Sequence, residues 1–196
     1  MRQASTKPGP MRRASTAYLL TCAVIGVAGG LLLVPANWLS TALFVTVPFI
    51  GVITAGLWLL PAVIALRLLQ RPGAGILVGL ISGLVLIPFS GYGFTSVATN
   101  LWWAFFAEVG FLVVAYRFWT LWQHYAGALL VGVVYPILAW QSYDLGAYTP
   151  VLQAVFFGIT IVSSVAGTAL GIGIAAGLRR SGVAATVRRK PRVVAE

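Results

Sequence analysis

Charged residues are scarce in this chain of 196 amino acids, and acidic residues are the scarcest of all. Lysine, arginine, aspartate and glutamate together make up 8% of the residues, whereas hydrophobic residues make up 60%. A soluble domain averages about 25% charged and about 45–50% apolar residues. A surface needs more charge than this to stay in water, so the composition excludes a soluble globular domain.

Residues that build metal sites and phosphate-binding loops are also nearly absent. The sequence has one cysteine, Cys22, and one histidine, His124, which excludes a disulfide framework, a cysteine-built metal site and an HExxH motif. Its two lysines, Lys7 and Lys190, are each followed by proline, so no GxxxxGK[ST] loop exists. We therefore expect no metal, no cofactor and no ATP hydrolysis by this chain itself.

Two carboxylates, Glu108 and Asp144, lie within the apolar part of the chain. General acid–base catalysis requires titratable groups that converge on one substrate. The sequence places Glu108 in a membrane helix and Asp144 in a polar loop, far from each other. We therefore expect a protein that is not an enzyme.

The basic residues form clusters that are separated by three spans without lysine or arginine, namely 14–66, 72–116 and 118–178. A bilayer core about 30 Å thick needs about 20 apolar residues in a helix, so each span is long enough for two crossings. Prolines, glycines and polar residues divide the spans further. The pattern predicts an all-α polytopic membrane protein with six transmembrane helices. Their expected ranges are 17–34, 51–69, 74–87, 96–118, 126–140 (with a start near 121 as the alternative) and 150–178.

The same clusters predict the orientation, because cytoplasmic loops carry the excess of lysine and arginine. Six crossings with both termini in the cytoplasm place all 13 basic residues on that side. An odd number of crossings would place one basic terminus outside. We expect a basic cytoplasmic tail at 1–16, a membrane domain at 17–180 and a second basic tail at 181–196. The tails are expected to be disordered and to lie near anionic lipid rather than to bind nucleic acid.

Glu108 is expected near the middle of the fourth helix, deep in the bilayer. A charged side chain there costs at least about 2.5–3.5 kcal/mol, and no lysine or arginine in its own span is close enough to pair with it. Two interpretations stay open. Glu108 is either a protonated side chain bonded to a neighbouring helix backbone or an acceptor for a cationic or amidine-like ligand, and we favour the second.

Further candidates share the depth or the helical face of Glu108. Asn100 and Trp102 flank its face, whereas Trp103 points nearly opposite and is expected to face lipid or to pack. Aromatic walls with a few amides and one acid suit a small planar polar ligand. Core packing is the alternative for Trp58 and Tyr135, and interface anchoring is the alternative for the loop tyrosines. The predicted substrate-binding residues are Glu108, Asn100, Trp102, Trp58, Gln153, Tyr135 and Tyr148.

Small residues four positions apart recur on several of the expected helices, for example Cys22, Gly26 and Gly30 on the first. Such stripes let membrane helices approach closely. Most of them must serve internal packing, and one on an outside face would suit docking to another membrane protein.

Three parts of the sequence resemble the S components of energy-coupling factor (ECF) vitamin transporters, and more specifically their YkoE type. The first is the turn Gln70-Arg-Pro-Gly-Ala74, and the second is Ala107-Glu-Val-Gly-Phe-Leu112 leading to Tyr116-Arg-Phe-Trp119. The third is Tyr143-Asp-Leu145 followed by Ala147-Tyr-Thr-Pro150. The likeness extends over about residues 17–180.

The resemblance implies a bacterial plasma-membrane subunit that captures hydroxymethylpyrimidine, thiamine or a related vitamin precursor. It implies an ECF transmembrane T component and two cytoplasmic ATPases as partners, and Glu108 as a ligand contact. The AxxxA docking motif that S components often carry on their first helix is replaced here by Cys22-xxx-Gly26-xxx-Gly30. A stand-alone facilitator or exporter, and an assembly factor without a ligand, stay open as alternatives.

Overall fold

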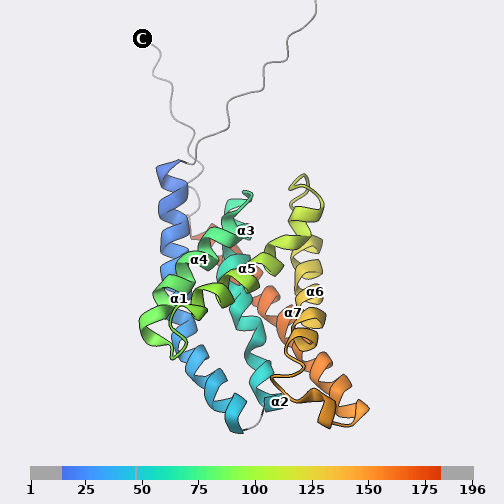
Figure 1. The fold of residues 1–196 in the computed structure, drawn as a ribbon. Coiled ribbons are helices and arrows are strands. Elements are labelled where there is room, and N and C mark those ends of the chain that lie inside the picture. Colours follow the sequence, from blue (N-terminus) through green and yellow to red (C-terminus); the bar gives the residue numbers. More distant parts are fainter. Residues whose placement is uncertain (1–14, 47, 182–196) are drawn as a thin grey trace, which may run out of the picture.

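The structure is a computed structural model that describes residues 15–46 and 48–181. The basic tails predicted at 1–16 and 181–196 lie almost entirely outside these residues. The described chain is helical and contains no strand (Figure 1). Its elements are α1 (Thr16–Thr46), α2 (Pro48–Gly51), η1 (Val52–Leu59), α3 (Leu60–Leu69), α4 (Ala74–Leu86), η2 (Ile87–Phe89), α5 (Thr95–Val113), α6 (Leu121–Leu138), η3 (Leu145–Ala147) and α7 (Pro150–Arg180).

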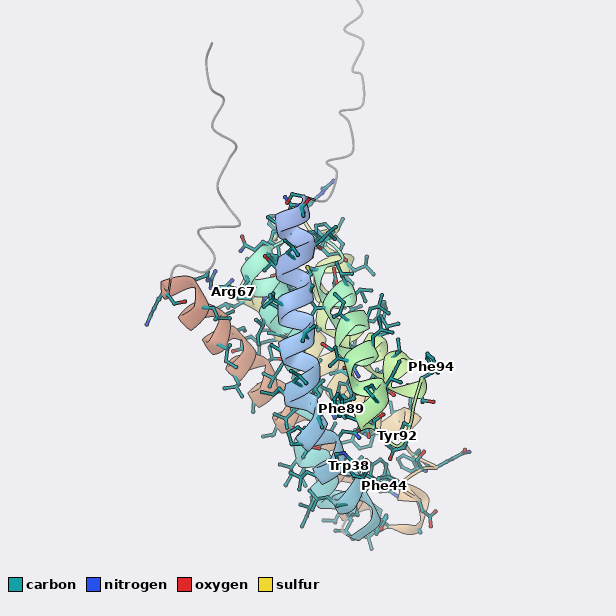
Figure 2. The ribbon with its side chains drawn as sticks, turned by 90° about the vertical axis from the view of Figure 1, so that its left-hand side faces the viewer. Trp38, Phe44, Arg67, Phe89, Tyr92 and Phe94 are labelled. Atoms are coloured by element: carbon teal, nitrogen blue, oxygen red, sulfur yellow. The ribbon has the colours of Figure 1, made fainter. Side chains whose placement is uncertain are left out.

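Six apolar helical segments form the bundle. Five of them are long and apolar enough to cross a membrane, and the sixth, Ala74–Phe89, is shorter. The five are Thr16–Phe44, Phe49–Leu69, Thr95–Val113, Leu121–Leu138 and Pro150–Arg180. The all-helical polytopic architecture is therefore confirmed. The start of α1 and the end of α7 lie at the same end of the bundle (Figures 1 and 2), while the side of the membrane that this end faces stays a prediction.

The two ends of the bundle differ in charge. Arg67, Arg71, Arg117, Arg179 and Arg180 all lie at or near helix termini on the end where α1 begins, and we call it the arginine end. The opposite end is formed by the α1–α2 junction and by the loops that join α4 to α5 and α6 to α7. We call it the loop end.

Helix α1 does not stop before Pro35, as the sequence suggested, but continues to Thr46. A proline inside a helix removes one backbone hydrogen bond, and membrane helices tolerate this because neighbouring groups satisfy the freed carbonyl. The second half of α1 leans toward α2 (Figure 1). As a result, the residues after Pro35 form a wall of the bundle instead of a loop.

The second membrane segment is built from α2, η1 and α3, and its middle is a 3-10 helix of eight residues. This stretch packs unusually close to α7, where a Cβ placed on Gly167 would lie 2.1 Å from the carbonyl oxygen of Gly56. The hydroxyl of Ser163 accepts a hydrogen bond from the Gly56 amide at 2.9 Å and donates one to the carbonyl of Ile53 at 2.6 Å. A side chain from α7 therefore supports the irregular backbone of η1.

The small-residue stripe of α1 is internal. Cys22 is fully buried, and the space beside Gly26 and Gly30 is filled by Ile81 and Val85 of α4. The stripe lets α1 and α4 pack closely. It is therefore not an exposed docking motif, because α4 already covers it.

Helix α5 ends at Val113, earlier than the predicted end at 118. The backbone then turns through two successive left-handed residues, Ala115 (φ 49°) and Tyr116 (φ 56°). Nothing in the apolar composition of this stretch predicts such a turn. Its consequence is that Glu108 lies in the last two turns of α5, near the arginine end, and not at the middle of the helix.

Glu108 is held by three hydrogen-bond donors. One carboxylate oxygen accepts hydrogen bonds from the Gly73 amide and, at 2.9 Å, from the hydroxyl of Tyr116. The other accepts from the Ile76 amide at 3.0 Å. The carboxylate thus caps the first turn of α4, where backbone N–H groups have no partner within the helix and the macrodipole favours an anion. Glu108 is thus bonded to a neighbouring helix backbone, as one of the two interpretations of the sequence proposed, while its role as a ligand contact stays a prediction.

The capping contact also affects Tyr116, which follows α5. Burial of the phenol, and next its hydrogen bond to Glu108, raise the pKa of Tyr116 to about 12. The hydroxyl therefore stays protonated at neutral pH and remains a donor to Glu108.

Replacing the capping carboxylate is expected to weaken the fold. Hydrogen bonds to charged groups contribute about 1.5–3 kcal/mol, so Glu108→Gln should lower the thermal unfolding midpoint of the detergent-purified protein. Asp144→Asn changes the second carboxylate of the described residues, which lies at the loop end. It is the matched control and should leave the midpoint unchanged. Equal midpoints for wild type and Glu108→Gln would contradict the capping role.

Candidate functional site

A cavity of about 540 Å³ opens at the loop end of the bundle. Its walls come from the second half of α1, from η1, from the α4–α5 loop with the first half of α5, and from the end of α6. Seven aromatic residues line it: Phe44, Trp58, Tyr92, Trp102, Trp103, Tyr135 and Tyr143. The polar lining consists of Asn37, Ser40, Thr41, Thr54, Thr95, Ser96, Thr99 and Ser142.

The aromatic wall is a connected set of rings. The rings of Trp102 and Trp103 meet edge to face with centroids 5.0 Å apart, and Trp103 lies 5.2 Å from the ring of Tyr135. Trp103 is 3% exposed, so it packs inside and does not face lipid. Neighbouring positions on a helix are about 100° apart, which lets Trp102 and Trp103 border the same cavity from two sides.

Two contacts join the elements around the mouth. The hydroxyls of Thr41 and Tyr92 lie 3.4 Å apart, and the ring of Phe44 meets that of Tyr143 edge to face at 4.7 Å. Figure 2 shows Phe44 and Tyr92 at this end of the bundle. Tyr92 and Tyr143, two of the loop tyrosines, line the cavity.

Tyr143 and Tyr135 form a hydrogen-bonded pair, with their hydroxyl oxygens 3.0 Å apart. Burial, and next the neighbouring Tyr135, raise the pKa of Tyr143 well above its usual range. Its phenol therefore stays protonated near neutral pH and can orient a ligand as a donor.

Among the described residues that line the cavity, none is charged and none is a histidine or cysteine. The described part of the chain also holds no group of three His, Cys, Asp or Glu side chains that suits a metal ion. Transition metals prefer imidazole, thiolate or carboxylate ligands. The donor set of hydroxyls, one amide and aromatic rings therefore fits an organic ligand.

Three of the predicted substrate-binding residues, Trp58, Trp102 and Tyr135, come together in this cavity. The other four lie outside its lining. Glu108 caps α4 near the arginine end, and Asn100 donates to the Ser96 carbonyl at 2.8 Å in the α4–α5 contact.

The remaining two support the loop before α7. Gln153 donates to the carbonyls of Leu145 and Tyr148, both at 3.0 Å. The Tyr148 ring packs edge to face on Phe49 at 4.8 Å. Both residues shape the loop end without reaching the cavity.

One group of cavity residues that sequence reasoning missed lies on the continued part of α1. Asn37, Ser40, Thr41 and Phe44 are spaced i, i+3, i+4 and i+7, which places them on one helical face. That spacing is a usable signal. The spacing places these residues on one face only if they are helical, so it gives no signal when the first helix is predicted to end before Pro35.

Comparison with solved structures finds a protein of similar fold. One solved structure, described as the crystal structure of an S-component of an ECF transporter, superposes with a TM-score of 0.77 over 88% of this chain and 89% of that chain. The sequence identity of 20% means that this likeness concerns the fold. No curated protein matches the chain.

A family model, described as "ABC-type cobalt transport system, permease component", matches residues 18–134. The match covers α1 to α5 and most of α6, which is more than half of the chain. The chain therefore belongs to the family of ABC-type cobalt transport system permease components.

Proposed function

We propose that this protein is the substrate-specific subunit, or S component, of an ECF-type importer in the bacterial plasma membrane. We further propose that its ligand is a small planar heterocycle of the hydroxymethylpyrimidine or thiamine type. The observation that carries the proposal is the uncharged cavity with aromatic walls, in a fold similar to that of a solved S component.

The cavity chemistry favours a flat ligand that is neutral or permanently cationic. Indole and phenol rings stack on planar rings and attract organic cations through their π faces. Hydroxyls and the amide of Asn37 offer the donors and acceptors that an aminopyrimidine requires. An anion would lose its hydration without gaining a positive partner, which is costly.

The family name points to cobalt, but the described cavity has none of the ligands that a divalent transition metal prefers. We therefore propose an organic substrate and treat cobalt as the competing ligand. Glu108, which the sequence favoured as the ligand contact, has no part in this proposal because it caps α4.

The proposed partners are an ECF T component and two cytoplasmic ATPases. The sequence has no phosphate-binding loop of its own, so energy for uptake has to come from another subunit. A stand-alone facilitator or exporter is the alternative, since it would use the same cavity without partners.

Ligand binding tests the site directly. Thiamine and hydroxymethylpyrimidine should quench or shift tryptophan fluorescence of the purified protein. Trp102→Ala should raise the Kd at least about tenfold, or about 1.4 kcal/mol, because it removes a stacking surface of the cavity. Trp122→Ala is the matched control, since Trp122 is 71% exposed near the arginine end, and it should leave the Kd unchanged.

The same titration with cobalt(II) chloride distinguishes the two ligand classes. Saturable cobalt binding that survives Trp102→Ala, together with no response to either heterocycle, would contradict the organic-ligand proposal. The topology and the family assignment would be unaffected by that result.

Uptake measurements test the partners. We expect uptake of radiolabelled ligand by cells only when a T component and both ATPases are co-expressed, and we expect these subunits to co-purify with the tagged chain. Substituting the phosphate-loop lysine in the ATPases should abolish uptake but leave ligand binding intact. Uptake that continues without the ATPases would instead identify a facilitator.

A further inference from the structure

Two arginines and the single histidine of the chain lie at the arginine end, away from the cavity. Arg67 lies in the last turn of α3, Arg179 in the last turn of α7, and His124 in the first turn of α6. Figure 2 shows Arg67 beside the final turns of α7. This places three groups that can donate hydrogen bonds or carry positive charge at the junction of three helices.

The three groups lie within electrostatic range of one another. The charge of Arg179 acts on Arg67, and the charge of Arg67 acts on the imidazole of His124. Like charges so placed repel each other unless an anion lies between them. The C-terminal ends of α3 and α7 together supply only about one negative charge, against two guanidinium groups.

The described carboxylates do not provide the missing anion. Glu108 is engaged by the backbone of α4 and by Tyr116. Asp144 lies in the loop between α6 and α7, at the opposite end of the bundle. The positive charge at the α3–α7 junction is therefore uncompensated within the described chain.

Hydrogen bonding gives a second, independent observation. The Nε atom of Arg67 and the Nδ1 atom of His124 are buried and have no hydrogen-bond partner among the described residues. His124 is only 2% exposed, and the ring of Phe111 packs edge to face against it at 4.7 Å. Buried polar atoms are nearly always paired, and an unpaired one destabilises the fold.

We propose that Arg67, Arg179 and His124 form a binding site for a phosphate-type oxyanion. Guanidinium groups match phosphate oxygens with paired N–H donors, and an imidazole N–H adds a third direction. The anion would neutralise the repulsion between the arginines. It is supplied either by the headgroup of an anionic phospholipid, since both arginines lie at the ends of membrane segments, or by soluble phosphate.

The test uses the full-length protein purified in a neutral detergent. The probes are phosphatidylglycerol, phosphatidylcholine and inorganic phosphate, and the readouts are the shift in thermal midpoint and the number of lipids retained in native mass spectrometry. We expect phosphatidylglycerol to raise the midpoint and phosphatidylcholine to have no effect. A rise with inorganic phosphate alone would support the same site with a soluble source.

Variants assign the effect to this site. Arg179→Gln changes an exposed side chain and should fold normally, and it should weaken phosphatidylglycerol binding at least fivefold. Arg67→Gln should do the same. Arg117→Gln, an exposed arginine near the same end, is the matched control and should change binding less than twofold. Equal losses for Arg117→Gln and Arg179→Gln, or no response to either phosphate source, would overturn the proposal.

Discussion

Hydrocarbon offers no hydrogen bonds, so a polar group inside the bundle is stabilised when it finds its partner within the protein. The carboxylate of Glu108 shows the result most directly, because it satisfies two amides at the start of α4 and a phenol that follows α5. One side chain thereby fixes the α3–α4 turn against the end of α5. The same requirement explains why Ser163 binds the backbone of η1, where the 3-10 geometry is irregular.

The distribution of charge is sufficient to predict an all-helical membrane protein, since a water-soluble helix of this length needs charged residues on its outer face. Helix boundaries are less predictable. Pro35 predicts an end to the first helix by a rule that holds in water but weakens where neighbouring helices satisfy the freed carbonyl. The left-handed pair Ala115 and Tyr116 leaves no signal at all, because neither residue type favours that conformation.

These boundary errors decide which site residues the sequence can reveal. The predictions for Trp58, Trp102 and Tyr135 place them in the cavity that they line, because large aromatics with polar tips at similar depth tend to border the same space. The predicted position of Glu108 at the middle of its helix is wrong, since α5 ends at Val113 and Glu108 therefore lies toward the arginine end. Its main partners are backbone amides, which every sequence possesses, so no pattern of residue types could reveal the pairing.

The cavity and the arginines lie at opposite ends of the bundle, and this separation limits what the protein can select. Without a counter-charge in its described lining, the cavity distinguishes ligands by shape, stacking and neutral hydrogen bonds. One wall is rigid, because Gly56 of η1 and Gly167 of α7 meet with no room for a side chain. At the mouth, the contacts of Thr41 and Phe44 with the facing loops are a long hydroxyl contact to Tyr92 and one ring contact to Tyr143. Both contacts are weak, so a ligand can displace them as it enters, while the close η1–α7 contact holds the backbone beside the cavity in place.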